Sequence, residues 1–187
     1  MAAAPITEST TLELEDELRL AIVADTHSQP HERTLELVKK TRPDRILHAG
    51  DIGAQAVIDD LSTIAPTLTV RGNIDVGHLD FPDQILIDVE KDEELFFKVL
   101  LLHIGVNGPK LRAEVMRRAK QVDASLVVCG HSHVPFIGKD RGVAIFNPGS
   151  VGPRRFHLPI VFGLMTVRPK GVTLEHVSCE TGERWMP

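Results

Sequence analysis

Cysteine is scarce in this chain of 187 residues, which has two, Cys129 and Cys179. Two cysteines cannot form the disulfide framework that stabilises many small secreted domains. Cys129 closes an apolar run that begins at Leu126, and we expect it to be a buried thiol. The low cysteine content therefore favours a reducing compartment.

Long apolar runs and targeting segments are also absent from the sequence. A helix needs roughly 20 apolar residues to cross a membrane, and the longest apolar run, residues 159–167, is far shorter and typical of a strand. Residues 1–5 lack the basic region and the apolar core of a signal peptide. We therefore expect a cytoplasmic protein that does not associate with membranes.

Positive charge is in slight deficit, with 21 Lys and Arg against 26 Asp and Glu and a net charge of -5. Nucleic-acid-binding proteins usually present a basic face, so this balance argues against broad electrostatic binding to nucleic acid, although a local basic patch stays open. The composition is 42% hydrophobic and 25% charged, which is typical of a globular protein with a sizeable core.

The first part of the chain differs from the rest. Residues 1–17 are polar and rich in Thr and Glu, and we predict a flexible N-terminal extension followed by a single domain over 18–187. Leu12 and Leu14 alternate with glutamates, so a short edge strand is the alternative.

The first half of the domain alternates apolar runs with helical patterns. The expected elements are strands over 18–24, 45–48 and 67–70 and helices over 31–41 and 54–64. Strands that alternate with helices predict a parallel sheet covered by helices.

The second half is richer in strands. It is expected to hold an antiparallel pair over 84–89 and 95–103, a helix over 109–120, and strands over 125–129, 134–138, 143–146, 160–167 and 172–177. Together the two halves predict an α/β fold, a four-layer α-β-β-α sandwich of two packed mixed sheets flanked by helices.

Polar side chains that bind metals follow these strands. They are Asp25, His27, Asp51, Asn73, His103, His131 and His133. Ligand sites in such sheets gather at the carboxyl ends of the strands. In an extended segment, side chains two residues apart point the same way, so the two histidines of Gly130-His131-Ser132-His133 can face a common region.

The set contains two carboxylates, one amide and four imidazoles, about the number that two metal ions need. Mixed nitrogen and oxygen ligands suit manganese, iron, zinc or nickel better than calcium. A carboxylate such as that of Asp51 can bridge two ions.

The series resembles the metallophosphoesterase (calcineurin-like) superfamily and, in finer detail, its small bacterial and archaeal phosphodiesterase branch. The stretches that carry the resemblance are Ala24-Asp25-Thr26-His27-Ser28, His48-Ala49-Gly50-Asp51-Ile52, Val70-Arg71-Gly72-Asn73-Ile74-Asp75, Gly130-His131-Ser132-His133 and Asn147-Pro148-Gly149-Ser150. The resemblance covers about residues 18–178. The family fold, a β-sandwich flanked by helices, agrees with the predicted layers.

The resemblance implies two divalent metal ions, with manganese favoured and iron, zinc or nickel as alternatives. One ion would be held by Asp25, His27, Asp51 and His133, and the other by Asp51, Asn73, His103 and His131, so that Asp51 bridges. Ions about 3.5–4 Å apart can generate a bridging hydroxide that attacks a phosphoryl group in line, which makes a protein nucleophile unnecessary. Asp51, Asn73 and His131 are the predicted catalytic residues.

Two residues depart from the wider family pattern. Many members have a histidine, assigned as a proton donor, directly after the Gly-Asn pair, whereas this chain has Ile74. The small branch also lacks that histidine, so we predict a preference for esters with good leaving groups. Ile104 stands where the family usually has a glycine, directly after His103.

Several other residues allow either a functional or a purely structural interpretation. Arg154 and Arg155 are predicted to contact a substrate phosphate, with solvated surface arginines as the alternative. His48 is either a partner that fixes a ligand or an ordinary core histidine, and Asp75 is expected to support its loop rather than bind metal. Trp185 is compatible with docking on the body or with a subunit contact.

The predicted activity is that of a dinuclear metal-dependent phosphodiesterase acting on a small phosphodiester, such as a cyclic nucleotide or another nucleotide-derived ester. One alternative is a phosphomonoesterase. The other is a non-catalytic scaffold of the type of a eukaryotic retromer subunit, which resembles the same branch but works by binding partners. The oligomeric state is open, and a homo-oligomer is one alternative.

Overall fold

The computed structural model describes residues 4–75, 77 and 80–186. Two six-stranded sheets dominate the fold. The first has the order β1-β5-β6-β9-β11-β10, with bounds Thr7–Glu13, Gln84–Lys91, Glu94–Leu102, Leu126–Val128, Val143–Asn147 and Phe136–Asp140. The second has the order β14-β13-β12-β2-β3-β4, with bounds Arg184–Trp185, Gly171–Ser178, Val161–Arg168, Leu18–Val23, Arg45–His48 and Thr67–Thr69.

Both sheets are mixed. In the second sheet β2, β3 and β4 are parallel neighbours, and β12 joins β2 antiparallel. In the first sheet β9 lies parallel to both β6 and β11, whereas β5 pairs antiparallel with β6. The predicted antiparallel pair and the predicted parallel strands are both confirmed.

The continuous apolar sequence of β2 follows from burial on both faces of its sheet. Leu20 and Ile22 point into the main core between the two sheets, where they join residues of the first sheet such as Ile87. Ala21 and Val23 point the other way, into a second core beneath helices. Because side chains alternate along a strand, one strand serves two layers.

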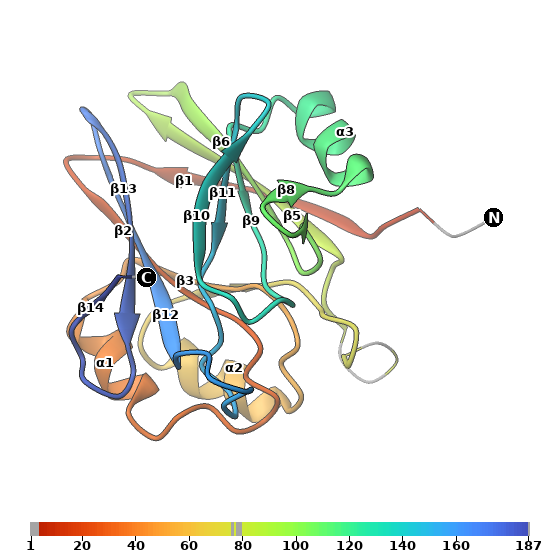
Figure 1. Ribbon diagram of the computed structural model, residues 1–187. Helices are drawn as coiled ribbons and strands as arrows, with labels where there is room; N and C mark the ends of the chain where they lie inside the picture. Colours follow the sequence, from red (N-terminus) through yellow and green to blue (C-terminus); the bar gives the residue numbers. More distant parts are fainter. Residues whose placement is uncertain (1–3, 76, 78–79, 187) are drawn as a thin grey trace.

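The helices lie on the two outer faces (Figure 1). Helices α1 (Thr34–Lys40) and α2 (Gln55–Ser62) cover the second sheet, and their buried residues belong to its outer core. Helix α3 (Ala113–Gln121) covers the first sheet, with Val115 and Met116 in a third core. The predicted four-layer α-β-β-α sandwich is therefore confirmed. Among the described residues, no helix is both long and apolar enough to span a membrane.

The N-terminal segment is not a loose extension over its described part. Strand β1 pairs in parallel with β5 along seven residues and forms the edge of the first sheet. Leu12 and Leu14 are buried in the main core, and their alternation with exposed glutamates reflects one face turned inward. The edge-strand alternative is therefore correct for these residues. Burial of the two leucine side chains in the main core stabilises the strand.

The helix predicted over 109–120 begins later, at Ala113. Residues before it form a small hairpin of β7 (Val106–Asn107) and β8 (Lys110–Leu111). Gly108, with a φ of 60°, turns this hairpin, so the proline after it belongs to a turn rather than to the helix. Strand β14 was not predicted, and it holds Trp185 edge-on against His176, with ring centroids 5.8 Å apart.

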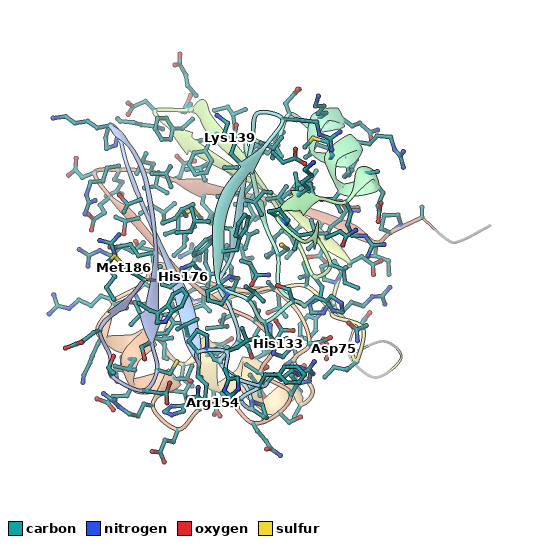
Figure 2. The ribbon with its side chains drawn as sticks, viewed as in Figure 1. Asp75, His133, Lys139, Arg154, His176 and Met186 are labelled. Carbon is teal, nitrogen blue, oxygen red and sulfur yellow. The ribbon has the colours of Figure 1, made fainter. Side chains whose placement is uncertain are left out.

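The ends of strands from both sheets meet at one end of the sandwich. The backbone N–H of Asp25, after β2, donates to the carbonyl of Gly50, after β3. The N–H of Gly130, after β9, donates to the carbonyl of His103, after β6. In Figure 2, His133 and Asp75 lie at this end and Lys139 lies at the opposite end. The fold thus brings the predicted ligands of both sheets to one edge.

The packing of β1 predicts a stability effect. Leu12→Ala should lower the free energy of unfolding by about 2–3 kcal/mol, because it removes buried apolar volume. Its exposed neighbour Glu13 provides the control, and Glu13→Ala should change stability by less than about 0.5 kcal/mol. Urea titrations of both variants measure the difference, and equal effects would mean that β1 does not stabilise the core.

Candidate metal centre

All seven predicted ligand residues lie in the short connections that follow strands. Asp25 and His27 follow β2, Asp51 follows β3, and Asn73 follows β4. His103 directly follows β6, and both His131 and His133 follow β9. Six of the seven residues, all except Asn73, fall into two groups of carboxylates and imidazoles.

In the first group, a ligand atom of each of Asp25, His27 and His133 lies within 4.8 Å of the others. The second group, Asp51, His103 and His131, meets the same limit. Asn73 joins the second group, because its Oδ1 lies 3.2 Å from Nε2 of His103 and 3.1 Å from Nδ1 of His131. The structure therefore brings together every predicted ligand, in the division that the resemblance implied.

Asp51 lies between the two groups. Its Oδ1 is 3.2 Å from Nε2 of His103 in the second group, and its Oδ2 is 3.8 Å from Nε2 of His27 in the first. Burial raises the pKa of Asp51, but the protonated form of His103 and the hydrogen bond from the Ile74 N–H outweigh this effect and bring the pKa to about 2. The carboxylate is therefore ionised at neutral pH and faces both groups, as a bridging ligand must.

The second group directs several electron-pair donors to one place, as a cation site requires. His103 Nδ1 lies 2.7 Å from the Ala49 carbonyl and donates to it, so the neutral ring has its lone pair on Nε2. That nitrogen faces oxygen atoms of Asp51 and Asn73, each at 3.2 Å. Three electron-rich atoms that converge at this distance repel one another unless a proton or a metal ion lies among them.

The first group shows the same property. Asp25 Oδ2 accepts the backbone N–H of His131, while the buried Oδ1 has no hydrogen-bond partner among the described residues. That oxygen lies 3.3 Å from Nε2 of His133, which in turn lies 3.4 Å from Nε2 of His27. A buried carboxylate oxygen that lacks a donor is costly, and a metal ion would satisfy it.

The ligands are displayed by left-handed backbone rather than by extended strand ends. Asp25, His27, Asp51, His131 and His133 all have φ between 47° and 67°. The extended geometry expected for the paired histidines is therefore wrong, because β9 ends at Val128 and the pair lies in a turn. Left-handed backbone is uncommon outside glycine, although Asp and His adopt it more readily than most residues, and such strain is concentrated at functional sites.

Two glycines leave room for the ligands. A Cβ on Gly72 would lie 2.1 Å from Oδ1 of Asp51, so a side chain there would displace the carboxylate. A Cβ on Gly50, which has a φ of 87°, would lie 2.7 Å from Nδ1 of His103. Glycine is required at both positions because the ligands approach the backbone closely.

Buried polar groups fasten the ligand loops. His48 Nδ1 accepts the N–H of Gly50, and its Nε2 donates to the hydroxyl of Thr26, which in turn donates to the Ile52 carbonyl. His48 is thus both a satisfied core residue and a link between the loops after β2 and β3. Asp75 accepts the N–H groups of Ile52, Gly53 and Gly72, which confirms that it supports its loop.

The Asn147–Ser150 loop fastens the remaining ligand segments. The side-chain amide of Asn147 donates to the Gly130 carbonyl at 2.8 Å, and the Ser150 hydroxyl donates to the Asp25 carbonyl at 3.1 Å. The motif Asn147-Pro148-Gly149-Ser150 belongs to the family resemblance, and the structure adds these hydrogen bonds. The Ala49 carbonyl, which orients His103, could not be predicted from the sequence, because a backbone group leaves no trace in the residue pattern.

The two predicted arginines occupy different places. Arg155 Nη2 lies 3.2 Å from Nε2 of His27, at the edge of the first group. Arg154 forms an ion pair with Glu180 and donates to the Leu158 carbonyl, so its guanidinium is engaged outside the centre. Burial lowers the pKa of His27, and the positive charge of Arg155 acts in the same direction. Of the two, Arg155 is the one placed beside a ligand.

Comparison with known families identifies the family of the chain. The calcineurin-like phosphoesterase superfamily domain matches residues 18–170. The chain belongs to this superfamily. Its members are metallophosphoesterases, and the two ligand groups imply divalent metal ions in this chain.

One curated protein is similar to this chain in sequence, and two solved structures are similar to it in fold. A probable metallophosphoesterase of Methanothermobacter thermautotrophicus is 29% identical over 170 residues, which cover 87% of this chain and 92% of that protein. The structure of vacuolar protein sorting 29 from Cryptosporidium parvum superposes with a TM-score of 0.73 at 19% identity, covering 91% and 96% of the two chains. YfcE, a phosphoesterase from Escherichia coli, superposes with a TM-score of 0.62 at 20% identity, covering 90% and 97%.

The buried state of His48 predicts a pH dependence of stability in this phosphoesterase. Burial lowers the pKa of His48 from 6.5 to about 4. Between these values the unfolded chain binds a proton that the folded chain does not, so the stability contributed by neutral His48 falls as the pH falls. The contribution amounts to about 3 kcal/mol across the window.

The comparison variant is His48→Asn, which keeps an acceptor near the Gly50 N–H and does not titrate. Between pH 6.5 and 4, the metal-free wild type should lose up to about 3 kcal/mol more stability than the variant. Urea unfolding in the presence of a chelator measures this. Parallel pH profiles for the two proteins would contradict the assignment of a neutral, linking His48.

Proposed function

We propose that this phosphoesterase is a phosphodiesterase that depends on two divalent ions, with manganese as the favoured metal. The observation that carries the proposal is the position of Asp51, whose two carboxylate oxygens face separate groups of ligands. When bound, the ions activate water for attack on phosphorus and offset the charge on the phosphate oxygens. Water adds to phosphorus as the bond to the leaving oxygen breaks, giving an alcohol and a phosphomonoester.

The residues of the chain have separate tasks in this reaction. Asp51 and Asn73 hold their oxygens toward His103, so that the three side chains would together bind the second ion. His131 is exposed, and its backbone N–H donates to Oδ2 of Asp25. Its ring, which contacts Asn73, therefore lies where the centre meets solvent. Arg155 lies on the other flank, beside His27, and supplies a guanidinium for a phosphate oxygen.

The position directly after Asn73 offers no side-chain proton donor for the leaving group. Ile74 follows Asn73 directly, and its backbone N–H donates to Asp51 while its side chain carries no proton to transfer. A substrate with a good leaving group needs little protonation in the transition state. This favours an ester whose leaving group has a low pKa over a simple alkyl monoester.

A scaffold function is the second candidate. It is favoured by the likeness to vacuolar protein sorting 29, whose TM-score of 0.73 exceeds the value of 0.62 for YfcE. Against it stand the strained backbone and the tight glycine contacts that hold the ligands of this chain. A protein that only binds partners has no need to maintain such strain at five ligand positions.

Removal of one ligand tests the metal-dependent activity. With bis(p-nitrophenyl) phosphate and Mn²⁺, Asp51→Asn and His131→Ala should each lower kcat/KM by about 100-fold or more, because each weakens the second group. Asp92→Asn, in an exposed turn, is the matched control and should retain full activity. Equal hydrolysis by the wild type and all three variants would show that the activity arises elsewhere.

Replacement of Ile74 tests the missing proton donor. For a series of aryl phosphodiesters, wild-type rates should fall steeply as the pKa of the leaving phenol rises. Ile74→His should make this dependence shallower by supplying a general acid, an effect of about 10²-fold or more for the poorest leaving groups. Ile74→Leu is the control and should keep the steep slope. A flat wild-type profile, with chemistry shown to limit the rate, would rule out the idea.

A further inference from the structure

A groove opens beside the second ligand group. It has a volume of about 830 Å³, and both Asn73 and His103 line it. Its apolar surface comes mainly from the half-buried Leu102 and Ile104, with the buried Leu100 and Val115 beneath. This volume lies within the range of small-molecule sites, and the groove is continuous with the metal centre because the same residues belong to both.

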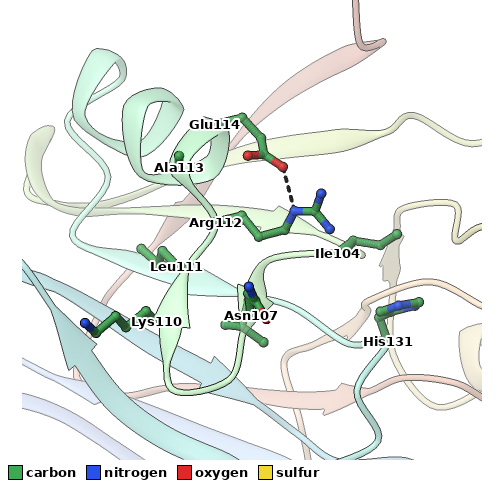
Figure 3. Close-up of a pocket in the computed structure, with 9 residues that line it drawn as sticks. Ile104, Asn107, Lys110, Leu111, Arg112, Ala113, Glu114 and His131 are labelled. Carbon is green, nitrogen blue, oxygen red and sulfur yellow. Dashed lines mark hydrogen bonds and ion pairs between the residues drawn. The ribbon is translucent and has the colours of Figure 1, made fainter.

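Ile104, the residue directly after His103, lines the groove next to the centre. It also lines a neighbouring hollow of about 670 Å³, which His131 and Arg112 share. In Figure 3, Ile104 lies between Arg112 and His131. The side chain that departs from the family pattern therefore places apolar surface directly beside two ligand residues.

The groove has an excess of positive charge. Arg71 is neutralised by Asp83 through two hydrogen bonds, of 2.8 and 3.1 Å, and Arg112 pairs with Glu114 at 2.6 Å. Arg117 and Arg118 also line the groove. Within the part of the chain that the structure describes, neither of these two arginines has a carboxylate within ion-pair distance.

Arg118 is held in place without being neutralised. Its Nε donates to Oε1 of Gln84 at 3.1 Å, and its Nη1 lies 3.4 Å from Oε1 of Gln121. Both partners are neutral amides, so they fix the direction of a half-buried guanidinium and leave its charge available. A fixed, uncompensated guanidinium is suited to bidentate recognition of a phosphate.

We propose that the groove binds one ester arm of the substrate and that this arm carries a second phosphate. The inference rests on the proposed phosphodiesterase function. The organic body of the arm packs against Ile104 and the apolar floor, and its second phosphate contacts Arg118. The substrate class is thus a nucleotide-like diester with an additional phosphate, because a compact cyclic nucleotide has one phosphate and leaves Arg118 without a partner.

Two chromogenic esters with the same leaving group test the inference. One is the p-nitrophenyl ester of thymidine 5′-phosphate, and the other is the same ester with an added 3′-phosphate. With Mn²⁺, the wild type should show a kcat/KM about tenfold or more higher for the 3′-phosphorylated ester, as expected for one charge-assisted phosphate contact. Nitrophenolate release measures both rates, and a ratio near 1 would overturn the inference while leaving the phosphodiesterase function intact.

Substitutions test which residues cause the preference for the 3′-phosphorylated ester. Arg118→Gln should bring the ratio of the two kcat/KM values close to 1, and Arg118→Lys should retain part of it. Arg168→Gln removes a surface arginine that pairs with Glu17, and it should leave the ratio unchanged. Ile104→Ala should lower the preference for the thymidine ester over methyl p-nitrophenyl phosphate. A ratio that Arg118→Gln does not alter would refute the assigned phosphate contact.

A binding measurement tests the proposed phosphate contact in the groove independently of the proposed phosphodiesterase activity. If no diester is hydrolysed with Mn²⁺, Zn²⁺, Ni²⁺ or Fe²⁺, the proposed function is wrong. Calorimetry with thymidine 3′,5′-bisphosphate and thymidine 5′-phosphate then tests the groove alone. Tighter binding of the bisphosphate, by about tenfold and lost in Arg118→Gln, supports the groove. Equal affinities for the two nucleotides would overturn it.

Discussion

The electron-rich atoms around Asp51 repel one another, and the rest of the site has to hold them close together against this repulsion. The fold holds carboxylate, amide and imidazole acceptors close together, with the two carboxylates and two of the imidazoles buried and with Asn73 and His131 exposed at the outer side. Such an arrangement is unfavourable unless a cation occupies it, and this is what makes it a metal centre. The stability of the sandwich has to maintain it in the absence of the ions.

The layers around the centre provide this support. Two sheets with a shared core supply rigid strand ends. Hydrogen bonds accepted by His48 and Asp75 and donated by Asn147 tie the connecting loops to one another. Left-handed backbone at the ligands would relax if these loops were free. The buried network therefore sets the ligand geometry, and its polar members are as much part of the centre as the ligands.

The centre has two unlike flanks. On the side of His27, Arg155 offers a positive charge at the surface, whereas on the side of His103 a groove with an apolar floor leads to Arg118. A phosphodiester has an ester arm on each side of phosphorus, so different flanks can distinguish its two arms. The two ligand groups therefore lie between different surroundings, which would orient a bound phosphodiester in one way.

The sequence by itself determined the parallel strands of the first half, the layer architecture and the identity of all seven candidate ligands, because strand periodicity and metal-binding side chains are both local signals. Tertiary structure decided how the ligands are displayed, the packing of β1, and the difference between Arg154 and Arg155. It also decided that Ala49 orients His103 through a carbonyl and that Arg118 lines a groove shared with Asn73. These features depend on backbone groups and on contacts between distant segments, which the residue pattern of any one segment does not record.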